Sequence, residues 1–186
     1  MKNDLKDFVA LDLEVTGDNP TVDLIIKFDA VRFRNGKLPM DRFQEVCNPG
    51  AKINESTQAK TGISLSVIKK ARPTDIVQAA FFHFLGGCPL IIHNAQFDMA
   101  FINAECERSH IDKFANTVID TLTLARKTVK NAANFKLETL SAIAKISTDE
   151  PAPYQVGRLW LFLQVRASKR GLDPMLGITR ENEMQA

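Results

Sequence analysis

Two acidic side chains at alternate positions near the N-terminus are the first candidates for chemistry. Asp12 and Glu14 lie at the end of an apolar, β-rich run that begins at Phe8. Alternate residues of a strand project to the same face, so both carboxylates share one side of the predicted sheet. Hard divalent cations such as Mg²⁺ and Mn²⁺ prefer oxygen ligands, and this pair would supply part of such a site.

A solvated surface is the alternative interpretation of any acid-x-acid pair. The chain contains two further pairs of this kind, Glu105/Glu107 and Glu181/Glu183, which we interpret as exposed to water. The N-terminal pair differs from them because it follows a run of residues that we expect to be buried. Charge at the end of a core strand is costly unless a partner or ligand compensates it.

A second polar cluster, with the sequence His-Asn-Ala-Gln-Phe-Asp, occupies residues 93–98. It follows a short apolar strand and opens a predicted helix, which places Asp98 about one turn into that helix. Ligands of open α/β sheets bind beyond the carboxyl ends of the strands, where this cluster would lie. The ordinary roles here are an acid that favours the helix dipole at Asp98 and a helix N-cap at Asn94. Both interpretations stay open.

The predicted elements that must position these side chains describe an α/β fold. The strand predictions cover residues 8–13, 24–33, 43–47, 89–92 and 118–119. The helix predictions cover residues 74–85, 96–109, 137–146 and 154–170. Asn35-Gly36 predicts a tight hairpin between the second and third strands. A meander followed by alternating helices and short strands indicates a layered fold, with a mixed central sheet of about five strands flanked by helices.

The composition is that of a single soluble domain. The 186 residues are 45 % apolar and 25 % charged, and the net charge of +2 is too small to predict a generally basic surface. Three cysteines without a C-x-x-C pair argue against a zinc cluster and favour a reducing compartment. Without a long apolar stretch or a signal-peptide pattern, we expect a cytoplasmic protein with no membrane partner. The expected organisation is one domain over residues 1–171 and a polar C-terminal tail over residues 172–186.

Together the two acidic clusters resemble the first and second motifs of the DEDD superfamily of 3′–5′ exonucleases. Residues 8–17 (FVALDLEVTG) resemble the first motif, and residues 93–98 (HNAQFD) resemble the second. Supporting similarities occur in the same order at residues 48–50, 61–63, 118–122 and 136–140. The resemblance spans roughly residues 8–146 and is closest to the His-bearing branch that includes the proofreading epsilon subunit of bacterial DNA polymerase III. It implies a ribonuclease H-like three-layer fold.

The resemblance also implies a chemistry. Members of this family hydrolyse the phosphodiester bond at a nucleic-acid 3′ end with two divalent cations, Mg²⁺ or Mn²⁺. The catalytic and metal-binding residues would be Asp12, Glu14 and Asp98, with Asp12 bridging both cations. The residues that would contact the substrate are Thr16, Gly17, His93, Asn94 and Phe97. The implied partners are a single-stranded 3′ end and, beyond it, a DNA polymerase or a repair protein.

The third motif of the family is degenerate in this chain. The His-bearing branch has a His and, five residues later, an Asp on its last helix; these positions fall on Asp149 and Tyr154. A sister branch has a Tyr with an Asp four residues later, and Arg158 stands at that place here. Loss of a catalytic base costs about 10²–10⁴-fold in rate. Asp149 or Glu150 is a conceivable replacement ligand.

Three functions therefore remain open. The first is a metal-dependent 3′–5′ exonuclease with weakened activity. The second is a degenerate exonuclease domain that binds nucleic acid, or a replication or repair partner, without cutting. The third is a structural domain of a polymerase or repair assembly. The intact first and second motifs favour the first two, and the altered third motif favours the second.

Charged and aromatic residues outside the motifs have simpler interpretations. Lys27, which stands where the family usually carries an acid, shares a strand face with Asp29, and we expect the two to pair. The basic clusters are interpreted as solvated faces, with phosphate contact as the alternative; they lie at Lys69-Lys70-Arg72, Arg126-Lys127-Lys130 and Arg166-Lys169-Arg170. Core packing is the expected role of Trp160 and of five phenylalanines, Phe81, Phe82, Phe84, Phe97 and Phe101.

Overall fold

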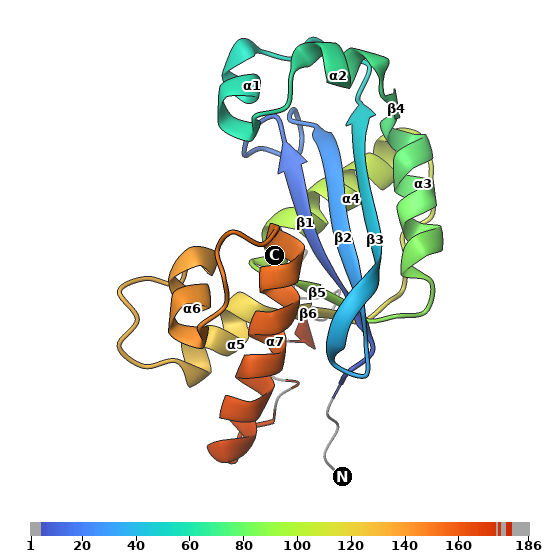
Figure 1. The fold of residues 1–186 in the computed structure, drawn as a ribbon. Helices are drawn as coiled ribbons and strands as arrows, with labels where there is room; N and C mark the ends of the chain where they lie inside the picture. The colour runs from blue at the N-terminus through green and yellow to red at the C-terminus, as the bar shows by residue number, and fades with distance from the viewer. Residues whose placement is uncertain (1–4, 174, 176–177, 180–186) are drawn as a thin grey trace.

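A computed structural model describes residues 5–173, residue 175 and residues 178–179 (Figure 1). The strands are β1 (Phe8–Val15), β2 (Ile25–Arg34), β3 (Lys37–Asn48), β4 (Arg72–Pro73), β5 (Leu90–Ile92), β6 (Val118–Asp120) and β7 (Ile178–Thr179). The helices are α1 (Glu55–Thr61), α2 (Leu65–Lys70), α3 (Thr74–Leu85), α4 (Ala95–Ser109), α5 (Thr121–Thr128), α6 (Leu137–Ala144) and α7 (Ala152–Lys169).

All strands join one mixed sheet with the order β4-β3-β2-β1-β5-β6-β7. β1, β2 and β3 form the predicted antiparallel meander, and β5 and β6 run parallel to β1. Asn35 and Gly36 both have positive φ, as the predicted hairpin turn requires. The five predicted strands are thus confirmed. β4 and β7 were missed because two residues carry no readable periodicity.

The C-terminal strand β7 corrects one expectation. Val118–Ile119 was predicted as the last strand, but Ile178 and Thr179 pair antiparallel with β6. These two residues lie within the predicted polar tail. Residues 180–186 lie outside the described residues, and the domain boundary at residue 171 stays a prediction.

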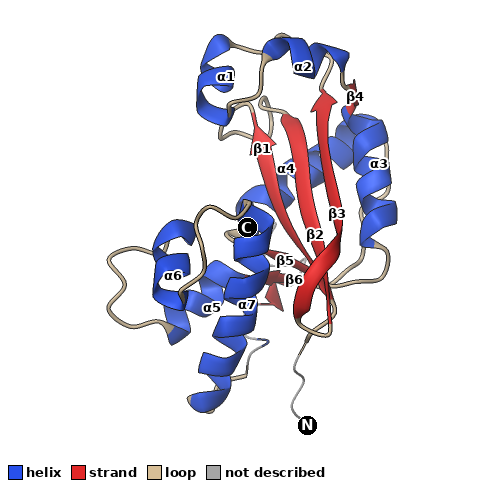
Figure 2. Cartoon of the chain, viewed as in Figure 1, coloured by secondary structure: helices blue, strands red, loops and turns tan. Residues whose placement is uncertain are grey.

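Helices cover both faces of the sheet, which confirms the three-layer α/β fold (Figure 2). Alternate residues of β1 point to opposite faces, so Val9 and Leu11 pack with α3 and α4 through Phe81 and Phe101. On the other face, an apolar cluster includes Phe8, Ala10, Val31, Phe33 and the α7 residues Trp160 and Leu163. Asp12 and Glu14 continue the series of Phe8 and Ala10 and therefore lie on the face that α7 covers.

Several helical details differ from the sequence prediction. The predicted helices are confirmed, including α6 with eight residues, but α1, α2 and α5, of six to eight residues each, were not predicted. In α3, Ile76 is 49 % exposed, while Val77 is buried. The run of phenylalanines in α3 makes two faces apolar, so periodicity did not define which one packs. The packing role predicted for the five phenylalanines and for Trp160 is confirmed.

The prediction that the Glu105 side chain is exposed to water is wrong. Glu105 is only 7 % exposed, and Arg108 forms an ion pair with its carboxylate at 2.9 Å. The same guanidinium donates to the Pro20 carbonyl oxygen at 3.0 Å, so α4 is tied to the loop after β1. Glu107 is exposed as expected, and the Glu181/Glu183 pair lies outside the described residues.

The start of α7 approaches the sheet unusually closely. A Cβ atom added to Gly157 would lie 2.2 Å from a ring carbon of Phe33, so only glycine fits there without repacking. This contact sets the distance between the sheet and the segment of α7 in which the third family motif is expected. In the described part of the chain, none of the helices combines the length and apolar character needed to span a bilayer.

Candidate functional site

The predicted site residues lie at the carboxyl ends of two neighbouring parallel strands. β1 pairs with β5 at Val9–Leu90 and Ala10–Ile91, so Asp12 lies beyond the paired segment. α4 begins directly after β5 and places Asp98 in its first turn. The main-chain N–H groups of Leu13 and Asp98 stabilise the Asp98 carboxylate, which shows that α4 enters beside the end of β1.

Asp12 and Asp98 form an electrostatically unfavourable pair. Burial raises the pKa of Asp12 to about 7, and the charges of Glu14 and Asp29 add to the rise. Burial, followed by repulsion from Asp12, holds the pKa of Asp98 well above its ordinary value. Asp98 is 7 % exposed, and only main-chain N–H groups oppose this shift. Two carboxylates held in this way cost stability, and a bound cation would offset that cost.

Glu14 has a different electrostatic setting, because a lysine lies opposite it. In the β1–β2 register Glu14 pairs with Lys27 and Asp12 pairs with Asp29, so all four side chains share the α7 face. Burial raises the pKa of Glu14, and Lys27 acts in the opposite direction. The predicted pairing of Lys27 with Asp29 is confirmed by a distance of 3.0 Å between Nζ and Oδ2.

Asp29 is the centre of a polar cluster that the sequence motifs did not reveal. It is 4 % exposed and accepts hydrogen bonds from Arg42 Nε at 3.0 Å, Arg42 Nη2 at 2.8 Å and Gln44 Nε2 at 3.0 Å. The Arg42 guanidinium lies 5.8 Å from the centre of the Tyr154 ring. Tyr154 is the residue at the expected position of the third-motif acid. The family's carboxylate is therefore replaced here by the Tyr154 ring, which lies against the Arg42 guanidinium beside Asp29.

Neither candidate replacement ligand faces the buried pair. Glu150 Oε1 lies 2.9 Å from Arg158 Nη2 in an ion pair, so both of these charges are engaged with each other. Asp149 is exposed, and its main-chain N–H donates to Ser147 Oγ. Neither acid is among the charges that shift the pKa of Asp12 or Asp98.

Asp120, at the end of β6, is the main positioning residue that sequence reasoning missed. Its carboxylate accepts from the main-chain N–H groups of Asn94 at 2.9 Å and Ala95 at 3.3 Å, which are at the start of α4. It also accepts from Leu122 N–H, and from Thr123 N–H and Oγ1, at the start of α5. One carboxylate thus caps two helices and fixes the turn before Asp98. The signal was an Asp-Thr pair directly after a strand.

His93 and Asn94 occupy the turn that Asp120 fixes. His93 Nε2 lies 2.9 Å from the Phe135 carbonyl oxygen, and Nδ1 lies 2.9 Å from Thr121 Oγ1, so both ring nitrogens have partners. Burial lowers the pKa of His93, which favours the neutral imidazole. Asn94 occupies the N-cap position of α4 in a left-handed conformation, but its side chain makes no capping hydrogen bond. The N-cap interpretation of that side chain is therefore wrong, and substrate contact by either residue stays a prediction.

Thr16, Gly17 and Phe97 complete the predicted set. Thr16 Oγ1 donates to Asp23 Oδ1 at 3.0 Å and accepts from Leu24 N–H at 3.0 Å, which closes the loop after β1. A Cβ atom added to Gly17 would lie 2.5 Å from the Asp23 carboxylate, so glycine allows this closure. Phe97 packs partly buried against the core, with its ring centre 5.1 Å from that of Phe101.

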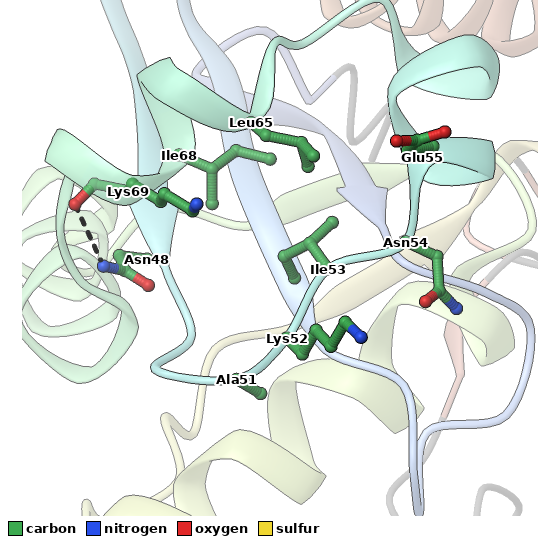
Figure 3. Close-up of a pocket in the computed structure, with 9 residues that line it drawn as sticks. All are labelled: Asn48, Ala51, Lys52, Ile53, Asn54, Glu55, Leu65, Ile68 and Lys69. Carbon is green, nitrogen blue, oxygen red and sulfur yellow. Dashed lines mark hydrogen bonds between the residues drawn. The ribbon is translucent and has the colours of Figure 1, made fainter.

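The described residues line two surface cavities, one of which includes His93 and Asn94. One has a volume of about 600 Å³ and lies between the start of α4 and the segment before α6, with Arg126 and Lys136 in its lining. The other, of about 470 Å³, lies beside α1 and α2. Figure 3 shows the side chains of Ile53, Leu65 and Ile68 converging in this second cavity, with Lys69 at its border.

The donor set was compared with the two-cation site that the family resemblance implies. Among the residues that the structure describes, no group of three or more His, Cys, Asp and Glu side chains is placed to hold a metal ion. The half-buried Asp12 and the buried Asp98 provide neighbouring carboxylate oxygens, which suits one hard cation. The Glu14 carboxylate is partly offset by Lys27. The described residues therefore fit one divalent cation better than two.

Comparison with known proteins agrees with this architecture. The family model described as "Exonuclease" matches residues 9–151 and ends directly before α7. A PolC-type DNA polymerase III from Listeria monocytogenes is 36 % identical over 134 residues, which cover 72 % of this chain and 9 % of that protein. The corresponding protein from Latilactobacillus sakei is 36 % identical over 143 residues, covering 77 % and 10 %. The chain thus spans about a tenth of the length of these curated relatives.

Solved structures of exonuclease I share the fold. The apo enzyme aligns with a TM-score of 0.72 at 20 % identity over 88 % of this chain and 43 % of that one. Exonuclease I from E. coli in complex with a dT13 oligonucleotide aligns with a TM-score of 0.73 at 19 % identity, over 89 % and 42 %. The family match covers most of the chain, including both acidic clusters. The chain therefore belongs to the exonuclease family, with the ribonuclease H-like fold of the DEDD 3′–5′ exonucleases.

Proposed function

We propose that the chain is a metal-dependent 3′–5′ exonuclease domain that binds a single-stranded 3′ end and hydrolyses its terminal phosphodiester slowly. One observation carries the proposal: the half-buried Asp12 lies close enough to the buried Asp98 for its charge to raise the pKa of Asp98, and burial itself raises the pKa of both acids. Structural carboxylates of this depth are normally paired with a cation, and main-chain N–H groups alone oppose the pKa rise of Asp98. A site built at such a cost is characteristic of function.

The proposed roles follow from position. Asp12 and Asp98 would hold Mg²⁺ or Mn²⁺, which when bound supplies positive charge against the phosphate oxygens. Glu14 would add a carboxylate on the same strand face. The closed loop at Thr16-Gly17 would accept the terminal nucleotide through main-chain groups. Asn94 and Phe97 would contact the strand from the start of α4.

Slow turnover follows from the third motif. A general base must lie within hydrogen-bond reach of the water it activates. Asp149 is exposed, Tyr154 packs against Arg42, and Glu150 is paired with Arg158. None of these groups presents a base beside Asp12. We therefore expect a rate about 10²–10⁴-fold below that of a site with a positioned base.

A second candidate function is nucleic-acid or partner binding without cutting. The ion pairs of Arg42 with Asp29 and of Arg158 with Glu150 favour it, because they occupy the region in which the third motif would complete the site. The similarity to polymerases makes a replication protein the partner class to test. Both functions predict binding of a nucleic-acid strand, and they differ in whether the strand is hydrolysed.

A gel assay separates them. A labelled oligonucleotide with a free 3′ end, and the same strand with a blocked 3′ end, are incubated with the chain and Mn²⁺, as DNA and as RNA. The exonuclease proposal predicts shortening of the free strand alone, and none with Asp12→Ala. Intact strands throughout would overturn the proposed turnover and leave the binding function. Shortening that survives Asp12→Ala would show that a contaminating nuclease is responsible.

A further inference from the structure

We propose that the cavity of about 600 Å³ beside the start of α4 binds the phosphodiester backbone of the strand whose 3′ end lies at Asp12 and Asp98. This inference rests on the proposed function and extends it, because it assigns the path of the strand away from the reacting end. The residues that carry it are Arg126 on α5, and Asn134 and Lys136 before α6.

The cavity has a positive lining. Arg126 and Lys136 are both exposed, and neither forms an ion pair with an acid among the described residues. Burial lowers the pKa of His93; the Asp120 carboxylate raises it and Arg126 lowers it by a smaller effect, so both charges lie close to this lining residue. His93 itself is held neutral by burial. The lining residues therefore carry two positive charges, Arg126 and Lys136, which the nearby Asp120 carboxylate offsets in part.

The polar groups of the lining are mostly donors. Asn134 Oδ1 accepts from Lys136 N–H at 3.0 Å, so the acceptor end of this amide is occupied and its NH₂ group remains to donate. The Phe135 carbonyl oxygen is paired with His93 Nε2. The acid beneath the cavity, Asp120, already accepts five hydrogen bonds at the starts of α4 and α5. A surface rich in donors and poor in free acceptors suits an anion.

The position of the cavity argues for a nucleic-acid backbone as that anion. Asn94 belongs both to the cavity lining and to the turn that leads to Asp98. The cavity is therefore about one helical turn from the buried acids, at the carboxyl ends of β5 and β6. It is an open depression of about 600 Å³ on the surface, a shape that suits an extended backbone rather than an enclosed small molecule. Its exposed rim leaves room for the strand to continue.

The test uses the full chain, a short 5′-labelled DNA strand, EDTA to prevent cleavage, and fluorescence anisotropy over a series of salt concentrations. Arg126→Gln with Lys136→Gln removes the two proposed phosphate contacts. Lys127→Gln with Lys130→Gln is the matched control, because these exposed lysines lie in the same segment but outside the cavity. Both variants lose the same charge.

The proposal predicts about tenfold weaker binding for the cavity variant. The slope of log K against log salt should also become less negative by about 1.4, since each of the two lost single-strand phosphate contacts contributes about −0.7. The control should change binding by less than about threefold. Equal losses in both variants would overturn the cavity while leaving the proposed function intact. Competition by a nucleoside monophosphate as strong as by the strand would also overturn a backbone site. If the wild type does not bind but still shortens the strand with Mn²⁺, the cavity proposal alone fails.

Discussion

The double substitution Asp149→His with Tyr154→Asp should raise the rate of 3′-terminal hydrolysis by about 10²-fold or more. These two changes restore the base and the acid of the third family motif. The structure supports this register, because Tyr154 packs on Arg42, and Arg42 binds the Asp29 carboxylate that lies opposite Asp12 on the sheet. A carboxylate at position 154 would thus point toward the region beside Asp12. Position 149 lies in the exposed turn before α7, so a histidine there supplies the missing proton acceptor only if this turn moves toward Asp12 when metal and strand bind.

Arg42 sets the expected difference between the single and double variants. Tyr154→Asp alone places a carboxylate within reach of the Arg42 guanidinium, which now lies 5.8 Å from the ring of Tyr154. Arg42 would then neutralise most of the negative charge of the new carboxylate. We therefore expect the single change to raise the hydrolysis rate by less than about tenfold. Single-turnover rates with Mn²⁺ and a labelled strand measure both effects. Asp149→Asn with Tyr154→Phe is the control, and it should leave the rate unchanged.

The contradicting outcome is a correctly folded double variant without a gain in rate. Circular dichroism and thermal melting would first show that α7 still packs on the sheet. Under that condition, an unchanged rate would mean that position 154 does not face Asp12, or that the site does not perform nucleolytic chemistry. Either result would reject the assigned register of α7.

Asp12→Asn should stabilise the protein in the absence of metal. The pKa of Asp12 rises from its ordinary value of 3.8 to about 7 in the folded state, mainly through burial. Between these values the folded state binds more protons than the unfolded state, so the free energy of unfolding falls as the pH rises from about 4 to above 7. At 1.36 kcal/mol for each pKa unit, the full loss is roughly 4 kcal/mol. The neutral amide avoids this loss.

Urea unfolding in EDTA at pH 5 and pH 8 measures this effect. At pH 8 the variant should exceed the wild type by roughly 2–4 kcal/mol, and at pH 5 the difference should shrink to less than about 2 kcal/mol, because most of the loss develops between pH 5 and pH 7. Asp41→Asn is a suitable control, because Asp41 is 47 % exposed in a surface ion pair with Arg34, where removing the charge changes little. A wild type that is as stable at pH 8 as the variant would show that the Asp12 carboxylate is not buried at a cost.

The sequence predicted those parts of the fold and site that depend on local patterns. The hairpin at Asn35-Gly36, the predicted helices and the proximity of Asp98 to Asp12 follow from turn chemistry, periodicity and the family resemblance. The short helices α1, α2 and α5 did not, although α6, with eight residues, was predicted; short helices owe their stability to tertiary packing rather than propensity, so local patterns reveal them unevenly. The buried state of Glu105 depends on Arg108 and on a loop 85 residues away at Pro20, which no local pattern encodes.

The polar network around the site was equally beyond local patterns. Lys27 and Asp29 could be paired from their spacing, but Arg42 joins them only through the register of β2 with β3. Asp120 stood in a recognised stretch, yet its role depends on the approach of α4 and α5 to the same strand end. Register and helix approach are long-range properties, so they required the structure.

The most direct test of a cation site at Asp12 and Asp98 is a calorimetric titration with Mn²⁺ near pH 7.5. The wild type should show weak binding of about one cation, because two carboxylates face the site and the third motif supplies none. Asp12→Ala and Asp98→Ala should each abolish the heat of binding, while Asp41→Asn should leave it unchanged. Equal titrations for the wild type and Asp12→Ala would contradict the account, because the buried carboxylates would then hold no cation.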